Sequence, residues 1–190
     1  DFLLALQQGS SFSMSFVHDG FFWAAHHIWS RRFGLDDGPS TFLSLLLILV
    51  VLVFVYPLKA VYAGAFNFIP GFDSKDVFAL SSVDDFSGLL VIFGLAFSLL
   101  SGIIAALNWH AFRQADVIGL SEHEKFDTQT VTLLWFINAL IPLGSVAIAL
   151  LTTGVFWTKA ASFFYIAFAF VLPSLKIWRH RLRLNIYSRS

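Results

Sequence analysis

The sequence contains no cysteine and few charged residues. Without cysteine, disulfides and thiolate metal sites are excluded. Only 13% of the 190 residues are charged and the formal net charge is zero, so the chain carries no basic surface for a nucleic acid. The motifs of nucleotide-binding loops, zinc proteases and serine hydrolases are also absent. We therefore expect neither an enzyme that acts on a soluble substrate nor a nucleic-acid partner.

Apolar residues dominate what remains. They make up 57% of the chain, and the mean hydropathy of +0.76 is far above that of a soluble domain. A helix needs about 20 residues to cross a hydrocarbon layer about 30 Å thick. Runs of about that length contain no Asp, Glu, Lys or Arg: Phe42–Leu58, Phe86–Trp109, Thr128–Thr158 and Ala160–Leu175. The composition therefore predicts an integral membrane protein in contact with the lipid bilayer.

The apolar runs also predict the fold class. Membrane barrels alternate apolar and polar residues over short segments, and these runs do not alternate. The expected fold is an all-α, polytopic bundle of about five transmembrane helices that forms a single domain over residues 1–190. The predicted spans are about 10–30, 40–63, 86–110, 127–152 and 160–178.

The basic residues predict the orientation. If the Arg31 end of the first span is cytoplasmic, nine Lys and Arg residues lie inside and three outside. The C-terminus is then cytoplasmic, and we expect the membrane to be the bacterial inner membrane. The same topology leaves Asp1 outside, which predicts that an N-terminal helix is missing unless the first span inserts unaided.

An acid interrupts the first predicted span. Asp19 lies about 15 Å along the helix from Trp29, near the bilayer middle, where an ionised carboxylate costs a few kcal/mol unless it is shielded from lipid. Trp23 follows at i+4 and His26 at i+7, on the same helix face. With His18, these residues are the candidates for an ion pathway or polar seam.

A structural role for the acid is the alternative. Its carboxyl group could be hydrogen-bonded by His18, Asn108, Asn138 or a hydroxyl group of a neighbouring helix. Asn108 and Asn138 are themselves candidates for polar contacts between helices, since amide side chains hydrogen-bond across transmembrane interfaces.

Two histidines could ligate a cofactor. His27 and His110 fall near the inner ends of their helices, and neutral imidazole from facing helices can bind haem iron or the magnesium of a chlorophyll-type pigment. The alternative, which we favour, is that they lie at the membrane interface beside Trp29 and Trp109 and bind water, headgroups or backbone. We therefore expect no cofactor.

One stretch resembles a known family. Trp23-Ala24-Ala25-His26-His27-Ile28-Trp29, followed by basic residues, a short loop and an apolar helix, resembles the second and third helices of the endolysosomal potassium channels and their bacterial homologues. The segment GLSEHEKFDT after the third span is similar to linkers of related bacterial sequences. The resemblance implies that nearly the whole chain corresponds to helices two to six of a six-helix unit.

The chain departs from that family at its hallmark. The family's pore-lining first helix carries Phe-Ser-Asp, and the nearest stretch here is Val17-His18-Asp19-Gly20. Either the first span is an altered pore helix, or it is the second helix and the pore helix is absent. The Trp-His-His match favours the second interpretation.

The resemblance implies a potassium or other cation channel that works as a homo-oligomer around a central pathway for monovalent cations. Two alternatives come from other classes. One is an accessory structural subunit of a larger respiratory or photosynthetic membrane complex, which the scarcity of chemical motifs favours. The other is a haem- or pigment-binding membrane protein that uses His27 and His110.

Overall fold

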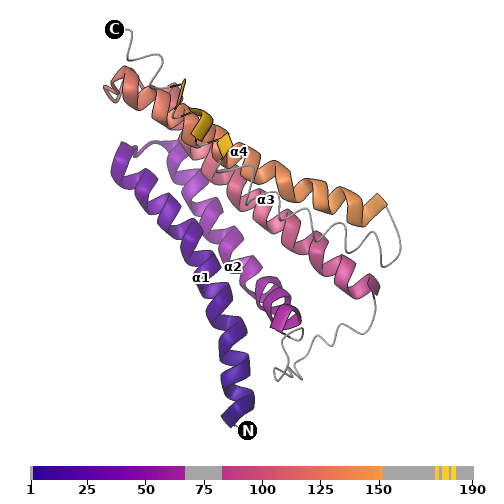
Figure 1. The fold of residues 1–190 in the computed structure, drawn as a ribbon. Coiled ribbons are helices and arrows are strands. Elements are labelled where there is room, and N and C mark those ends of the chain that lie inside the picture. Colours follow the sequence, from indigo (N-terminus) through magenta and orange to yellow (C-terminus); the bar gives the residue numbers. More distant parts are fainter. Residues whose placement is uncertain (1, 67–82, 152–173, 176, 180, 183–190) are drawn as a thin grey trace.

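The part of the protein that the structure describes is helical. The structure is a computed structural model that describes residues 2–66 and 83–151, with short pieces at 174–175, 177–179 and 181–182. The long helices are α1 (Phe2–Phe33), α2 (Gly38–Phe66), α3 (Val83–Arg113) and α4 (Glu122–Leu151). They pack side by side as a bundle (Figure 1). The predicted all-α fold class is confirmed.

The helices are longer than the spans predicted from the sequence. The first four predicted spans coincide with α1 to α4, which extend by up to about two turns beyond them because polar ends also take helical form. The fifth predicted span, 160–178, lies mostly outside the described residues. Within it, residues 174–175 and 177–178 are helical.

Three of these helices are long and apolar enough to cross a membrane: Gly38–Tyr62 in α2, Ser87–Arg113 in α3, and α4 over Glu122–Leu151. The chain is therefore an integral membrane protein. Among the described residues, α1 does not reach the same apolar content, although a span was predicted at 10–30. Its helix carries glutamine, serine, histidine and aspartate along its length, which lowers its hydropathy.

Local sequence signals set the turn between α1 and α2. α1 ends at Gly34, whose φ of 58° is the left-handed conformation that glycine adopts without strain. The Gly34 amide donates to the Ser30 carbonyl at 3.0 Å. Asp37 then caps α2, because its Oδ1 accepts the Ser40 amide at 3.1 Å.

The turn between α3 and α4 follows the same plan. Gly119 has a φ of 70° and precedes Ser121, which caps α4. The Ser121 amide donates to Glu124 Oε2 at 2.9 Å, and the Glu124 amide donates back to Ser121 Oγ at 3.4 Å. This reciprocal pair is a capping box. α2 and α4 therefore both begin at a side chain that accepts a hydrogen bond from a backbone amide of the first turn.

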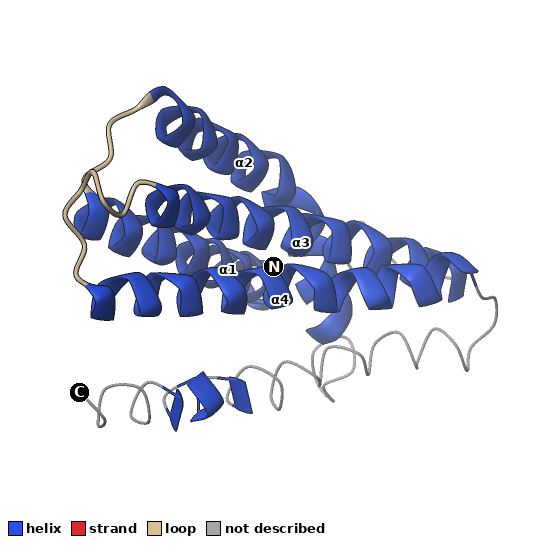
Figure 2. Ribbon diagram, turned by 90° about the horizontal axis from the view of Figure 1, so that it is seen from above, coloured by secondary structure: helices blue, strands red, loops and turns tan. Residues whose placement is uncertain are grey.

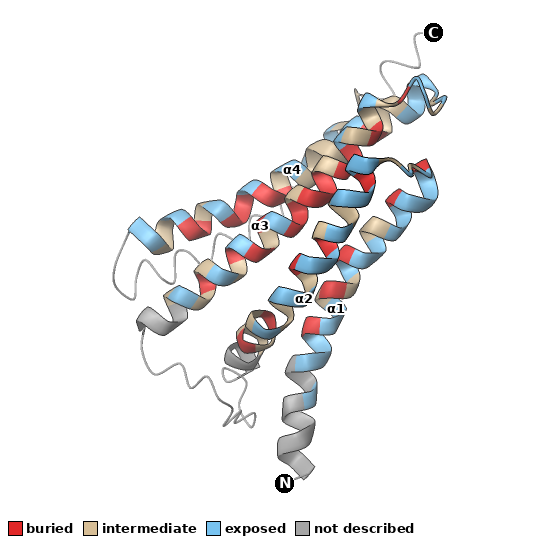
Figure 3. Ribbon diagram, turned by 180° about the vertical axis from the view of Figure 1, so that it is seen from behind, coloured by how far each residue is buried: buried red, intermediate tan, exposed pale blue. Residues whose placement is uncertain are grey.

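The core forms around α3. Leu100, Ile103, Ile104 and Leu107 of α3 are buried together with aromatic residues of α1 and aliphatic residues of α2. The view from above shows α3 between α2 and α4 (Figure 2). Buried residues lie where α3 faces its neighbours, whereas much of α1 is exposed (Figure 3). α3, which contacts each of the other three long helices, is therefore the central helix of the described bundle.

Polar contacts fix α4 and α1 against α3. Ser98 Oγ donates to the Ala139 carbonyl at 2.7 Å, and Asn138 Nδ2 donates to Ser101 Oγ at 3.1 Å. On the other side of α3, the buried Trp29 donates its Nε1–H to the Leu107 carbonyl at 3.0 Å. Because water is absent from a bilayer core, each such bond also satisfies a group that lipid could not.

Candidate functional site

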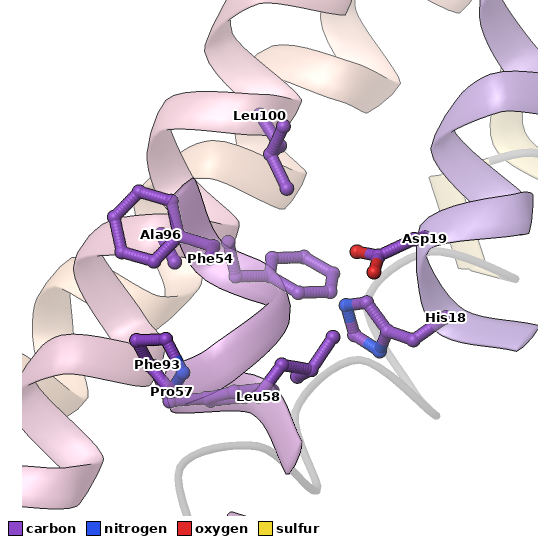
Figure 4. Close-up of a pocket in the computed structure, with 9 residues that line it drawn as sticks. His18, Asp19, Phe54, Pro57, Leu58, Phe93, Ala96 and Leu100 are labelled. Carbon is purple, nitrogen blue, oxygen red and sulfur yellow. The ribbon is translucent and has the colours of Figure 1, made fainter. Parts of the chain in front are cut away.

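Asp19 is a buried acid without a complete set of hydrogen bonds. Its side chain projects from α1 towards α2 and α3, facing Phe54 and Leu100 (Figure 4). The residue is 8% exposed, and within the described part of the chain its Oδ1 has no hydrogen-bond partner. An unpaired carboxylate in an apolar interior costs several kcal/mol. Within the described part of the chain, the other buried side-chain atom without a hydrogen-bond partner is Ser40 Oγ, so Asp19 is the acid among the two.

The space beside Asp19 is small. His18, Asp19, Phe54, Leu58 and Leu100 are among the residues that line a cavity of about 10 Å³. That volume accommodates one water molecule at most. A continuous aqueous path through the interior of the described bundle does not pass this point.

His18 lies beside Asp19 but is bound elsewhere. Its Nδ1 forms a hydrogen bond with the Tyr62 hydroxyl at 3.0 Å, and its ring packs edge-on against Phe93 and Phe97 of α3. The partners considered for Asp19 from the sequence are similarly engaged. Asn108 donates to the Ile104 carbonyl of its own helix at 2.9 Å, and Asn138 donates to Ser101.

Of the two asparagines predicted to join helices, Asn138 forms its hydrogen bond across a helix interface, from α4 to Ser101 of α3. The bond of Asn108 stays within α3, because the Ile104 carbonyl lies one turn before it on the same helix. The sequence pattern identifies neither partner, because an asparagine amide on an apolar helix can donate a hydrogen bond within its own helix or to a neighbouring helix.

The predicted polar seam on α1 is not uniform in the structure. Asp19 is buried, yet Trp23, one turn later, is 56% exposed. His26 is partly buried and its Nε2 hydrogen-bonds Ser44 Oγ of α2 at 2.8 Å. The rings of Trp23 and His26 lie 5.8 Å apart. Asp19, Trp23 and His26 share one side of α1. Of the four residues predicted for the seam, Asp19 and His18 line the cavity.

The two histidines considered as cofactor ligands have different surroundings. His27 is exposed on α1. His110 Nε2 lies 2.5 Å from Asp37 Oδ2, which also accepts a hydrogen bond from Gln114 at 2.6 Å. Among the described residues, no group of three or more His, Asp or Glu side chains could hold a metal ion. Binding of haem or a pigment by His27 and His110 stays a prediction.

The Asp37–His110–Gln114 cluster was missed by the sequence pattern. The sequence predicts only an interfacial position for His110. The two residues are 73 positions apart, so no local spacing indicates their contact. The cluster joins the α1–α2 turn to the end of α3 and is partly exposed.

Comparisons with known proteins agree with the family resemblance seen in the sequence. No family model matches the chain. A protein of Marivirga tractuosa named as a potassium channel is 29% identical over 136 residues, which are 68% of this chain and 54% of that protein. The chain thus spans about half the length of the curated relative that it matches.

The fold is similar to that of a solved channel. The crystal structure of a variant of the potassium channel MtTMEM175, in complex with a nanobody fusion protein, superposes with a TM-score of 0.80 at 23% identity. The match covers 100% of this chain and 82% of that one. The two comparisons together confirm that this chain resembles potassium channels, in sequence to one and in fold to the other.

Proposed function

We propose that this protein forms an integral membrane channel that passes potassium ions. The observation that carries the proposal is the agreement between the two comparisons, because the sequence relative and the structural neighbour are both named as potassium channels. Transport rather than catalysis also fits the absence of enzyme motifs from the sequence.

A conduction path between copies of the chain is favoured over one through a single copy. The cavity beside Asp19 holds at most one water, which is too little for a hydrated ion to pass. α1 also exposes large apolar side chains outside any groove, including Phe12, Phe16 and Val17, that another copy could cover. The proposed channel is therefore a homo-oligomer with its pathway at the contact between subunits.

The expected membrane is the bacterial inner membrane, with the C-terminus in the cytoplasm. The distribution of nine basic residues on one side against three on the other supports this orientation. Cysteine accessibility tests it directly, since the chain has no cysteine of its own. A cysteine placed at Arg31 should react with an impermeant thiol reagent only after the membrane is opened.

Potassium flux into liposomes tests the channel proposal. The purified chain is reconstituted, and potassium-driven flux is compared with flux in protein-free liposomes and with sodium-driven flux. We expect potassium flux well above both. Flux equal to that of protein-free liposomes, from protein that remains folded and inserted, would contradict the proposal.

We further propose that the Asp19 carboxylate stabilises a cation in the pathway. Across a protein interior a charge about 10 Å away contributes about 1 to 2 kcal/mol, which corresponds to about 5- to 30-fold in binding. Asp19→Asn should therefore lower potassium flux by up to about thirtyfold. Asp36→Asn is the matched control, because Asp36 is exposed in the turn before α2. Unchanged flux with lowered thermal stability in Asp19→Asn would identify the acid as structural instead.

A further inference from the structure

An apolar groove runs between α1 and α4. It has a volume of about 580 Å³, and α3 forms its floor through Phe97 and Asn108. α1 and α4 approach each other at one end of the bundle and diverge towards the other (Figure 1). The walls include Phe21, Ala24, Ile28 and Arg32 of α1 and Leu134 and Trp135 of α4.

The groove has the length of one membrane leaflet. Phe21, Ala24, Ile28 and Arg32 follow one another at spacings of three or four residues, so they form a stripe along one face of α1. From Phe21 to Arg32 the helix rises about 17 Å. Half of a hydrocarbon layer about 30 Å thick is about 15 Å. An extended acyl chain therefore fits along the groove.

The floor of the groove suits an apolar occupant. The amide side chains that line the groove are Asn108 on the floor and Asn138 on the α4 wall, and both already donate hydrogen bonds inside the protein. A hydrocarbon chain in the groove leaves these two bonds intact. It also covers Ile28, which is 67% exposed, and Phe21, which is 55% exposed.

One end of the groove carries a positive charge. Arg32 is exposed and lies over the Phe33 ring, with 5.2 Å between its Cζ and the ring centroid. Among the described residues it forms no salt bridge within 4.0 Å. Its charge acts on Glu124, but that carboxylate is engaged by the Ser121 amide and hydroxyl. The guanidinium thus has donors available for a phosphate group.

We propose that this groove binds an anionic phospholipid, with its phosphate at Arg32 and one acyl chain between α1 and α4. The charge at one end and the apolar walls beyond it match the two parts of such a lipid. A neutral lipid offers the same chain but no net negative headgroup. The proposal concerns lipid binding and is independent of ion transport.

Native mass spectrometry of the purified full chain tests the headgroup contact. Phosphatidylglycerol and phosphatidylcholine are added in turn, and the lipid-bound fraction is measured. A basic residue near an anionic headgroup contributes about 1 kcal/mol, so Arg32→Gln should weaken phosphatidylglycerol binding about fivefold. Phosphatidylcholine binding should weaken less, because the choline charge offsets the charge of its phosphate. The matched control is Arg31→Gln, because Arg31 is also exposed but does not line the groove. Equal loss in both variants would overturn the proposal.

A second pair of variants tests the acyl-chain contact. Ala24→Trp fills the groove and should reduce binding of both lipids, whereas Leu52→Trp places the same side chain on an exposed part of α2 outside it. The same spectra report the oligomer mass, which should not change, and circular dichroism verifies the helix content of each variant. If Ala24→Trp alters the oligomer mass while lipid binding persists, the groove is a contact between copies and the lipid proposal is wrong.

Discussion

At the scale of single residues, Asp37 has two roles. Its Oδ1 accepts the Ser40 amide at the start of α2, and its Oδ2 contacts His110 and Gln114 at the end of α3. Hydrogen bonding with Ser40 lowers the pKa of the Asp37 carboxyl from its ordinary value of 3.8, and the bond with His110 lowers it further. The ionised carboxylate is therefore the form that the folded protein favours.

This pKa shift predicts a dependence of stability on pH. A carboxyl group whose pKa is lower in the folded state stabilises the protein above its unfolded pKa, and the stabilisation is lost as the pH falls below that value. Asp37→Asn should therefore lower the thermal unfolding midpoint at about pH 7, and the difference from the wild type should shrink below about pH 4. Tryptophan fluorescence melting curves in detergent measure both midpoints.

Asp36→Asn provides the matched comparison, because Asp36 is the exposed neighbour in the same turn. It should leave the midpoint nearly unchanged over the same pH range. A difference between Asp37→Asn and wild type that is as large at about pH 3 as at about pH 7 would show that the carboxylate charge is not responsible.

At the scale of helices and turns, two glycines in the left-handed conformation stop α1 and the segment after α3. A side chain at Gly34, with φ of 58°, meets no atom within 4 Å, so the backbone alone determines its cost. Left-handed backbone costs a non-glycine residue about 1 to 2 kcal/mol. Gly34→Ala should therefore destabilise the protein by about 1 kcal/mol.

Gly88→Ala should have the opposite sign. Gly88 lies within α3, its φ is not positive, and an added Cβ also meets no atom within 4 Å. Alanine is favoured over glycine inside a helix by about 1 kcal/mol. Thermal unfolding of the two variants and the wild type, side by side, measures both shifts. Equal effects of the two substitutions would exclude the backbone explanation.

At the scale of the whole molecule, the helices differ in how well they are covered. α3 contacts α1, α2 and α4 and supplies most of the buried aliphatic core, whereas Phe12, Phe16 and Val17 of α1 are more than half exposed. Regions with few buried contacts open more readily than the core. α1 is therefore the helix whose stability depends most on its surroundings.

Hydrogen–deuterium exchange in detergent tests this order. Amides of α3 between Leu100 and Ala111 should exchange most slowly, and those of α1 before Asp19 should exchange fastest. Peptide-level mass spectrometry resolves the two regions. Equal protection of both would mean that another molecule, such as a second copy of the chain, covers the exposed face of α1.

The sequence by itself determined the helical class and the approximate positions of the helices. Charge-free runs predict helices because backbone amides in lipid must find partners within their own segment. Gly34, Asp37 and the Ser121–Glu124 pair set their turns through bonds that reach no more than four residues. The Trp-Ala-Ala-His-His stretch also indicated the resemblance that the comparisons later supported.

The tertiary structure alone decided which residues meet. Asp37 contacts His110 across 73 positions, and Trp29 contacts Leu107 across 78. It also decided that Asp19 points into the bundle while Trp23, on the next turn, is exposed. These outcomes depend on how each helix is rotated about its axis. The polar residues of α1 are spread around the helix, so its sequence carries no local pattern that fixes this rotation, and packing against its neighbours does.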